Sequence, residues 1–238
     1  MSAKKTLRIR RTEGHVDEFA VSAGPYTTLL DGLEEIRTGE DRRLVYRHSC
    51  HHGSCGTCGA IVNGERVLVC LTRLADLPAV SMVEPLSPYS IVADLAVDAD
   101  ALYERFPPDA GYLRPSEANP DADVPGEIER YTRFESCIEC GLCVSVCPVQ
   151  RPFMGPAALA AYGRELEKHP EREGELLPQI DTPDGVWACD RALACSAICP
   201  LGVAPAKHIA VLRRKAKAAE RSRPAEPEPL APDTTKKT

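Results

Sequence analysis

Several features that assign proteins to familiar classes are missing from these 238 residues. No apolar run approaches the roughly 18 residues that a membrane-spanning helix needs, so we expect any membrane attachment to depend on a partner. Aspartate and glutamate outnumber lysine and arginine, 35 against 29, for a formal net charge of -6. Because proteins bind nucleic acid through clustered positive charge, nucleic acid is not an expected partner.

Other signals are missing as well. The start of the sequence has neither the basic and apolar segments nor the cleavage site of a secretory signal, and the cysteine count of 11 is odd. These observations argue against a secreted disulfide scaffold, so we expect the thiols to act as ligands. There is also no Gly-x-Gly-x-x-Gly motif after a predicted strand. We therefore expect any nucleotide site and substrate chemistry to lie on another polypeptide.

What the chain does contain is cysteine in three blocks. The first block joins Cys50, Cys55 and Cys58 to the distant Cys70, which is the ligand spacing of a plant-type 2Fe-2S ferredoxin. Asn63-Gly64 is a strong hairpin signal, and a two-residue type I′ turn there brings Cys70 back beside Cys58. The spacing predicts a 2Fe-2S cluster held by these four thiolates.

The loop around the first block carries glycines and histidines. Gly53, Gly56 and Gly59 permit positive φ, which lets backbone N–H groups turn toward the cluster sulfurs. Cys50-His51-His52 raises the alternative of a histidine-ligated cluster, but Cys58 stands where a second histidine would be needed. We interpret these histidines as loop residues.

The second and third blocks match the cysteine runs of bacterial ferredoxins, in which the fourth cysteine of each run binds the other cluster. This exchange predicts a 4Fe-4S cluster on Cys137, Cys140, Cys143 and Cys199. It leaves Cys147, Cys189 and Cys195 for the other site, where Ala192 replaces a fourth cysteine. Because alanine cannot ligate iron, we predict a 3Fe-4S cluster. The alternative is a 4Fe-4S cluster with water or hydroxide on its fourth iron.

A structural zinc-binding protein is the alternative from a different class. Zinc ribbons place two cysteine pairs about 15 to 20 residues apart, and the blocks here do not have that spacing. We therefore favour iron-sulfur clusters and electron transfer.

The apolar pattern predicts an α+β chain, strand-rich first and helical later. The first part is expected to contain strands around residues 7–9, 19–21 and 44–46, a helix over 29–36 capped at Thr27 or Thr28 and stopped at Gly39, and the hairpin at 63–64. The second part is expected to contain helices over residues 101–106, 127–134, 156–168 and 205–219. The predicted boundaries are 1–97 for a β-grasp 2Fe-2S domain, 98–126 for a connector, 127–219 for a helical ferredoxin-like domain and 220–238 for a disordered tail.

These motifs together resemble the iron-sulfur subunit of succinate dehydrogenase and fumarate reductase. The segments that carry the resemblance are Cys50-His-His-Gly-Ser-Cys-Gly-Thr-Cys58, Cys137-Ile-Glu-Cys-Gly-Leu-Cys143, Gly155-Pro-Ala-Ala-Leu159 and Gly185-Val-Trp-Ala-Cys189. The resemblance extends over nearly the whole chain to about Arg214. It implies a β-grasp domain followed by a helical ferredoxin domain. It also implies electron transfer between FAD and a quinone through 2Fe-2S, 4Fe-4S and 3Fe-4S clusters in that order.

The resemblance also indicates where quinone would bind. Pro148, Trp187, Asp190 and Arg213 resemble residues near that site, and core packing is an alternative role for Trp187. Ubiquinone-type members have Trp shortly after the Cys-Pro pair and His after the next Cys; this chain has Arg151, Pro152 and Asp190. This departure favours menaquinone.

The implied partners are a flavoprotein subunit that carries FAD and interconverts succinate and fumarate, and membrane anchor subunits with or without haem. The implied location is the cytoplasmic face of the cell membrane, attached through the anchor. A relative that serves a thiol- or heterodisulfide-linked flavoprotein is an alternative. Such relatives carry an added cysteine-rich C-terminal domain, which this sequence does not show.

Overall fold

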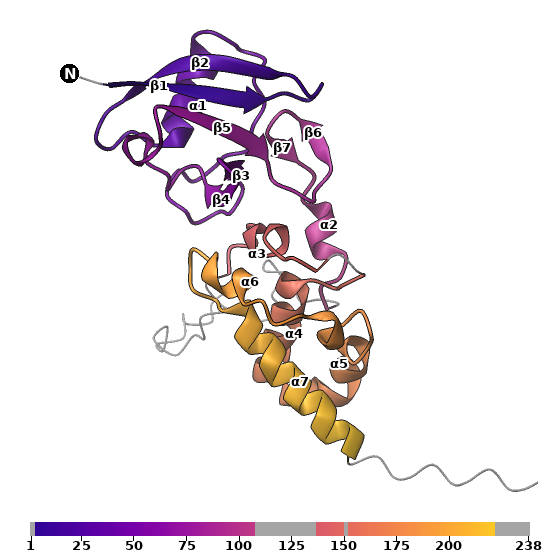
Figure 1. Cartoon of the computed structure of the whole chain (residues 1–238). Coiled ribbons are helices and arrows are strands. Elements are labelled where there is room, and N and C mark those ends of the chain that lie inside the picture. The colour runs from indigo at the N-terminus through magenta and orange to yellow at the C-terminus, as the bar shows by residue number, and fades with distance from the viewer. Residues whose placement is uncertain (1–2, 108–136, 150–151, 222–238) are drawn as a thin grey trace, which may run out of the picture.

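The computed structural model describes residues 3–107, 137–149 and 152–221. Most of the predicted connector, the helix predicted over 127–134 and most of the predicted tail lie outside these residues. Strands dominate the first part of the chain and helices the second, and the two parts form the upper and lower halves of the view in Figure 1. The predicted α+β organisation is therefore confirmed.

The first part is built on a mixed five-stranded sheet in the order β2-β1-β5-β3-β4. Parallel pairing joins only β1 and β5, and the other neighbours are antiparallel. The strands are β1 (Ala3–Arg10), β2 (Val16–Ala23), β3 (Gly59–Val62), β4 (Glu65–Leu68) and β5 (Val80–Pro85). A separate two-stranded sheet, which the sequence analysis did not predict, consists of β6 (Ile91–Ala93) and β7 (Ala96–Val97).

Local sequence signals explain the first hairpin and helix. Leu7 and Ile9 point one face of β1 into the core and are fully buried, as the alternation predicts. Helix α1 (Leu29–Thr38) begins after Thr28, whose hydroxyl accepts the Asp31 N–H while the Asp31 carboxylate accepts the Thr28 N–H. This reciprocal capping box and the stop at Gly39 confirm the predicted helix.

The predicted hairpin is also present. Val62 pairs with Glu65, and Asn63 and Gly64 have φ values of 50° and 88°, as a type I′ turn requires. The strand predicted over residues 44–46 is wrong. This segment meets the β6–β7 turn instead of a strand ladder: Val45 N–H donates to the Asp94 carboxylate and Val45 C=O accepts from Leu95 N–H. These two hydrogen bonds connect a single residue to a turn, so residues 44–46 do not pair with another strand that the structure describes.

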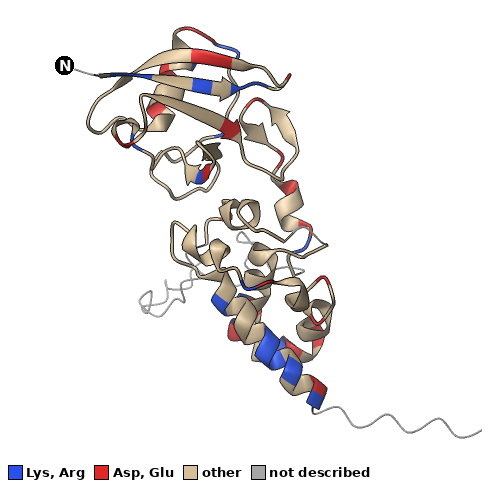
Figure 2. Ribbon diagram, in the orientation of Figure 1, with Lys and Arg blue, Asp and Glu red and all other residues tan. Residues whose placement is uncertain are grey.

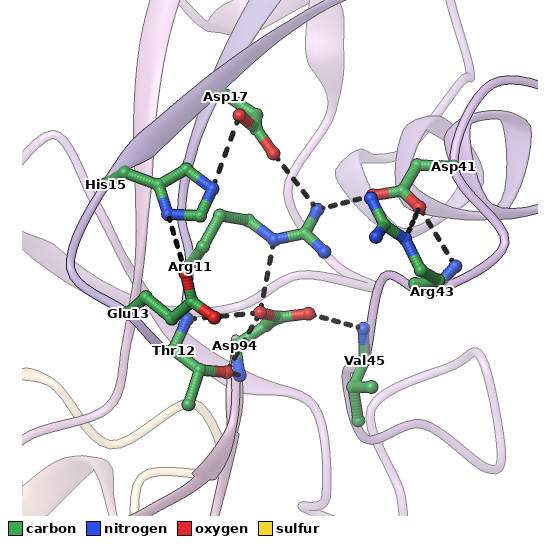
Figure 3. A network of polar contacts seen from close by, with 9 residues as sticks. All are labelled: Arg11, Thr12, Glu13, His15, Asp17, Asp41, Arg43, Val45 and Asp94. Atoms are coloured by element: carbon green, nitrogen blue, oxygen red, sulfur yellow. Dashed lines mark hydrogen bonds and ion pairs between the residues drawn. The ribbon is translucent and has the colours of Figure 1, made fainter.

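A buried ion pair links the end of β1 to the segments before and after the first cysteine block (Figure 3). Arg11 Nε lies 3.1 Å from Asp94 Oδ1, and its Nη1 lies 2.7 Å from Asp41 Oδ2. Asp94 also accepts the N–H groups of Thr12 and Val45. Burial raises the pKa of Asp94, but these N–H groups and the Arg11 charge outweigh it and lower the pKa overall. The network fixes the start of the segment that leads to the first cysteines.

The second part is helical. Its elements are α2 (Asp100–Tyr103), α3 (Leu142–Ser145), α4 (Pro156–Lys168), α5 (Glu173–Ile180), α6 (Ala194–Ala197) and α7 (Pro205–Arg221), with 3-10 turns at Pro170–Arg172 and Val186–Ala188. A further 3-10 turn, Leu74–Asp76, belongs to the first part, between β4 and β5. The prediction for α4 is confirmed at both ends, α7 runs two residues beyond its predicted end, α2 is shorter than predicted and α5 was not predicted. Helices α4 and α7 pack together around Leu159, Leu166, Ile209 and Leu212.

The two parts share apolar contacts. Leu142, at the start of α3, is only 2% exposed and belongs to the same buried cluster as Leu7, Leu33 and Leu86 of the first part. Burying a leucine side chain contributes about 1.5–3 kcal/mol. The cysteine loop that precedes α3 is thus held against the sheet domain.

Charge is unevenly distributed along the fold. Lys and Arg gather on α7 (Figure 2), where Lys207, Arg214, Lys217 and Arg221 are exposed. Among the residues that the structure describes, no helix is long and apolar enough to cross a bilayer.

Candidate metal centres

The first cysteine loop turns backbone N–H groups toward a thiol. Cys50 Sγ accepts the N–H of Ser54 at 3.2 Å and of Cys55 at 3.3 Å, with His52 N at 3.5 Å. The His52 N–H, supported by those of Ser54 and Cys55, lowers the pKa of the Cys50 thiol to about 6. Gly53 and Gly56 have the predicted positive φ, at 78° and 71°. The expectation for Gly59 is wrong, because it is the first residue of β3 and has no positive φ.

The hairpin brings the fourth thiol of this block to the others. Cys58 Sγ and Cys70 Sγ lie 3.3 Å apart, and both residues are buried. Val69 N–H donates to Cys58 C=O, so the β3–β4 pairing continues to the position beside the two cysteines. Burial raises the pKa of the Cys58 thiol. A bound metal would offset this cost because it favours the thiolate.

The histidines of this loop form part of a polar chain that the sequence analysis did not predict. His48 Nε2 lies 3.2 Å from Glu34 Oε1 on α1, and His48 Nδ1 lies 2.9 Å from His51 Nε2. Tyr46 donates its hydroxyl to the same glutamate at 2.5 Å, and this bond lowers the pKa of Glu34. These polar contacts connect the cysteine loop to helix α1. No sequence signal links Glu34 to a loop 14 positions away.

The second group of thiols lines a hollow between the Cys137–Cys143 loop, α4 and the segment before α7. Its cysteines are Cys137, Cys140, Cys143 and Cys199. Burial raises the pKa of Cys143 well above its ordinary value, and the nearby thiols of Cys140 and Cys137 raise it further. The structure therefore brings together the four residues of the predicted 4Fe-4S site, including the one from the third block.

The third group lines a separate hollow. Its cysteines are Cys147, Cys189 and Cys195, and Ala192 is among the residues of the wall. Helices α3 and α6, which carry or border these two groups, lie in contact (Figure 1). The position at which the sequence analysis expects a missing ligand thus faces the same hollow as the three thiols.

The two hollows are suited to iron-sulfur clusters by the residues that line them. Within residues 3–107, 137–149 and 152–221, no three His, Cys, Asp or Glu side chains form a group that could hold a single metal ion. An iron-sulfur cluster spreads its thiolates over several iron atoms, each with sulfide neighbours. The residues that line the two hollows fit such groups: thiolates from short loops, with apolar side chains around them.

Of the four residues predicted near quinone, two line the hollow of the third group and two lie outside its lining. Pro148 and Asp190 line its hollow. Arg213 donates from Nε to Val186 C=O at 2.7 Å and from Nη2 to Cys189 C=O at 2.7 Å. The Arg213 guanidinium lies 5.7 Å from the centre of the Trp187 ring, and Trp187 Nε1 donates to Asp181 at 2.7 Å. Arg213 thus holds the loop that carries Cys189, a contact that the sequence analysis did not foresee. Arg151, used in the menaquinone prediction, lies outside the described residues.

Comparison with known proteins agrees with this arrangement. A family model described as a 2Fe-2S iron-sulfur cluster binding domain matches residues 4–104, and one described as a 4Fe-4S dicluster domain matches residues 133–203. The chain is 36% identical to the fumarate reductase iron-sulfur subunit of Mycobacterium tuberculosis, over 75% of this chain and 76% of that protein. This chain belongs to the family of fumarate reductase and succinate dehydrogenase iron-sulfur subunits. The predicted family is confirmed.

Other members of the family are similar to this chain over most of its length. The fumarate reductase iron-sulfur subunit of Escherichia coli O6:H1 is 34% identical, over 88% of this chain and 92% of that one. The succinate dehydrogenase iron-sulfur subunit of Coxiella burnetii is 32% identical, over 82% and 86%. A chain of the Mycobacterium smegmatis Sdh1 complex in the apo form has the same fold, with a TM-score of 0.75, 24% identity and coverage of 97% and 100%.

The family membership confirms further predictions. This iron-sulfur subunit is an electron-transfer component of an oxidoreductase complex, and its 2Fe-2S and 4Fe-4S domains are those that the cysteine spacing predicts.

Proposed function

We propose that this iron-sulfur subunit relays electrons between FAD in a flavoprotein subunit, where succinate and fumarate interconvert, and a quinone held with a membrane anchor. The observation that carries the proposal is the grouping of all 11 cysteines into sets of four, four and three. The second and third sets each line a hollow of their own. The names of the curated relatives supply the substrate pair.

The proposed ligands follow the three groups. Cys50, Cys55, Cys58 and Cys70 hold a 2Fe-2S cluster in a domain of β-grasp type. Cys137, Cys140, Cys143 and Cys199 hold a 4Fe-4S cluster, and Cys147, Cys189 and Cys195 hold a 3Fe-4S cluster beside Ala192. The support is the proximity of Cys58 to Cys70 and the two lined hollows.

The quinone end is proposed at the third group. The proposed quinone residues are Pro148 and Asp190, which line the third hollow, together with Trp187 and Arg213 near Cys189. The residue departures in the sequence favour menaquinone. The subunit is proposed to sit at the cytoplasmic face of the cell membrane, held by anchor subunits, as its similarity to subunits of membrane complexes suggests.

The test is anaerobic purification of the complex through an affinity tag on this subunit, with identification of the polypeptides that accompany it. The expected result is a flavoprotein that oxidises succinate or reduces fumarate, a membrane polypeptide, and about nine iron atoms per copy of this chain. A flavoprotein active on thiols or disulfides would overturn the assignment of substrate. Zinc in place of iron and labile sulfide would overturn electron transfer itself.

A further inference from the structure

The first and second cysteine loops lie against each other at a glycine. Gly56, between Cys55 and Cys58, has a φ of 71°, and a Cβ built on it would lie 2.1 Å from the Ile138 carbonyl oxygen. The same Cβ would lie 3.1 Å from the backbone nitrogen of Cys140. These atoms belong to the backbone of a cysteine loop, so they cannot turn aside as a flexible side chain can.

Neighbouring residues extend this contact. Tyr89 donates its hydroxyl to Gly141 C=O at 3.3 Å, and a Cβ on Gly141 would lie 2.6 Å from that hydroxyl oxygen. Gly59 faces the Cys140 carbonyl, since a Cβ there would lie 3.4 Å away. Leu142 completes the contact from inside the core shared with the sheet domain. Two segments more than 80 positions apart are therefore packed backbone to backbone.

A positive φ does not by itself imply such a close approach, as two other glycines of this chain show. Gly14 and Gly64 also have positive φ, at 87° and 88°, yet a Cβ on either would meet nothing within 4 Å. Those two glycines serve turns, where only the backbone conformation matters. At Gly56 the positive φ is not the only constraint, because the second cysteine loop also leaves no space for a Cβ.

We propose that Gly56 is a positioning residue for electron transfer between the first two clusters, because its missing side chain sets how closely their loops approach. The inference rests on the proposed ligands. In the step concerned, the 2Fe-2S site loses one electron and the 4Fe-4S site gains it, or the reverse, and no covalent bond or proton changes. Such a step depends on the separation of donor and acceptor, as other positioned reactions do.

The experiment compares Gly56→Ala with Gly64→Ala in the purified complex. Both substitutions place a Cβ at positive φ, but only Gly56→Ala pushes the two loops apart. The first readout is the spin relaxation of the reduced 2Fe-2S signal when the 4Fe-4S cluster is also reduced, which reports their separation. The second is the delay, after mixing with succinate, between the rise of the 2Fe-2S signal and the loss of the oxidised 3Fe-4S signal, followed by rapid-freeze EPR.

For Gly56→Ala we expect weaker relaxation enhancement and a delay longer by roughly 10- to 100-fold, in line with the effect of a misplacement of about 1 Å. Gly64→Ala should match the unmodified complex in both the relaxation enhancement and the delay. Unchanged relaxation and delay in a Gly56→Ala complex with full iron content would overturn the inference.

If Gly56→Ala does not assemble, Tyr89→Ala tests the same contact by loosening it without adding a clash. It should weaken the relaxation enhancement, and normal relaxation with Tyr89→Ala would then overturn the inference. An unmodified complex without iron-sulfur signals would instead contradict the proposed function. The two failures are therefore distinguishable.

Discussion

Arg11 and Asp94 are 83 positions apart in the sequence, and they form an ion pair with Nε and Oδ1 at 3.1 Å and side chains only 9% and 7% exposed. The pair joins the end of β1 to the β6–β7 turn, and through Val45 to the segment that enters the first cysteine loop (Figure 3). If one partner is removed by mutation, the charge of the other stays buried and is poorly solvated. We therefore expect the stability of the sheet domain to be sensitive to substitution of either residue.

Replacing Asp94 tests this point. Asp94→Asn keeps the shape but removes one of the carboxylates that face Arg11, while Asp41 remains. We expect the free energy of unfolding to fall by about 1.5–3 kcal/mol, the scale of lost hydrogen bonds to a charged group. The measurement is the denaturant midpoint of the anaerobic, cluster-loaded protein. The control is Glu84→Gln, which removes the partner of Arg10 in a more exposed pair and should cost about 1 kcal/mol or less. Equal losses for both variants would contradict the role given to Asp94.

A buried histidine gives a prediction about pH. Burial lowers the pKa of His208 on α7 despite the nearby Glu167, and the ring packs against Gly163 on α4. Because the unfolded chain takes up a proton at a higher pH than the folded one, stability falls as pH drops below about 6.5 toward the folded pKa.

His208→Gln should therefore lose less stability than the unmodified protein between pH of about 7.5 and about 5.5. Thermal unfolding at the two values measures this difference. His169→Gln, at a histidine after α4 whose side chain is 42% exposed, is the control and should retain the full pH dependence. A His208→Gln protein with the same pH dependence as His169→Gln would show that another group titrates.

The third cysteine group gives a spectroscopic prediction. Ala192 lines the hollow that contains Cys147, Cys189 and Cys195, so Ala192→Cys supplies a fourth thiolate. We expect the near-isotropic EPR signal of the oxidised 3Fe-4S cluster to disappear and the iron content to rise by about one atom per chain, as a 4Fe-4S cluster forms. Ala192→Ser serves as a control of similar size. If the oxidised signal is already missing from the unmodified protein, the three-iron assignment is wrong.

Arg213 gives a prediction about the same loop. It donates to the carbonyl groups of Val186, Trp187 and Cys189, and Arg213→Gln removes the charge and most of these bonds. Leaving such acceptors unpaired costs about 1–3 kcal/mol. We expect the 3Fe-4S signal per chain to fall and to decay faster in air, with the 2Fe-2S signal unchanged. Arg214→Gln, at the exposed neighbour on the same helix, should leave both signals intact.

Much of this protein follows from short stretches of sequence. Asn63-Gly64 predicts its hairpin because both residues tolerate positive φ, and Thr28 and Asp31 cap α1 through bonds that span three positions. The cysteine spacings are equally local, since a ligand loop of a few residues has few ways to bring its thiols together. The missing ligand at Ala192 can be predicted for the same reason, because Ala192 occupies a cysteine position in the bacterial ferredoxin spacing.

Only the tertiary structure decided how these pieces meet. Residues 44–46 look like a strand, but Asp94 and Leu95 take their backbone groups. Gly56 contacts Ile138, and Arg213 donates a hydrogen bond to the Cys189 loop. Both contacts join segments that are distant in the chain. Sequence by itself determined which residues can bind iron, because that depends on residue type and near spacing. Packing decided how closely the cysteine loops lie, because contacts between distant segments depend on the whole fold.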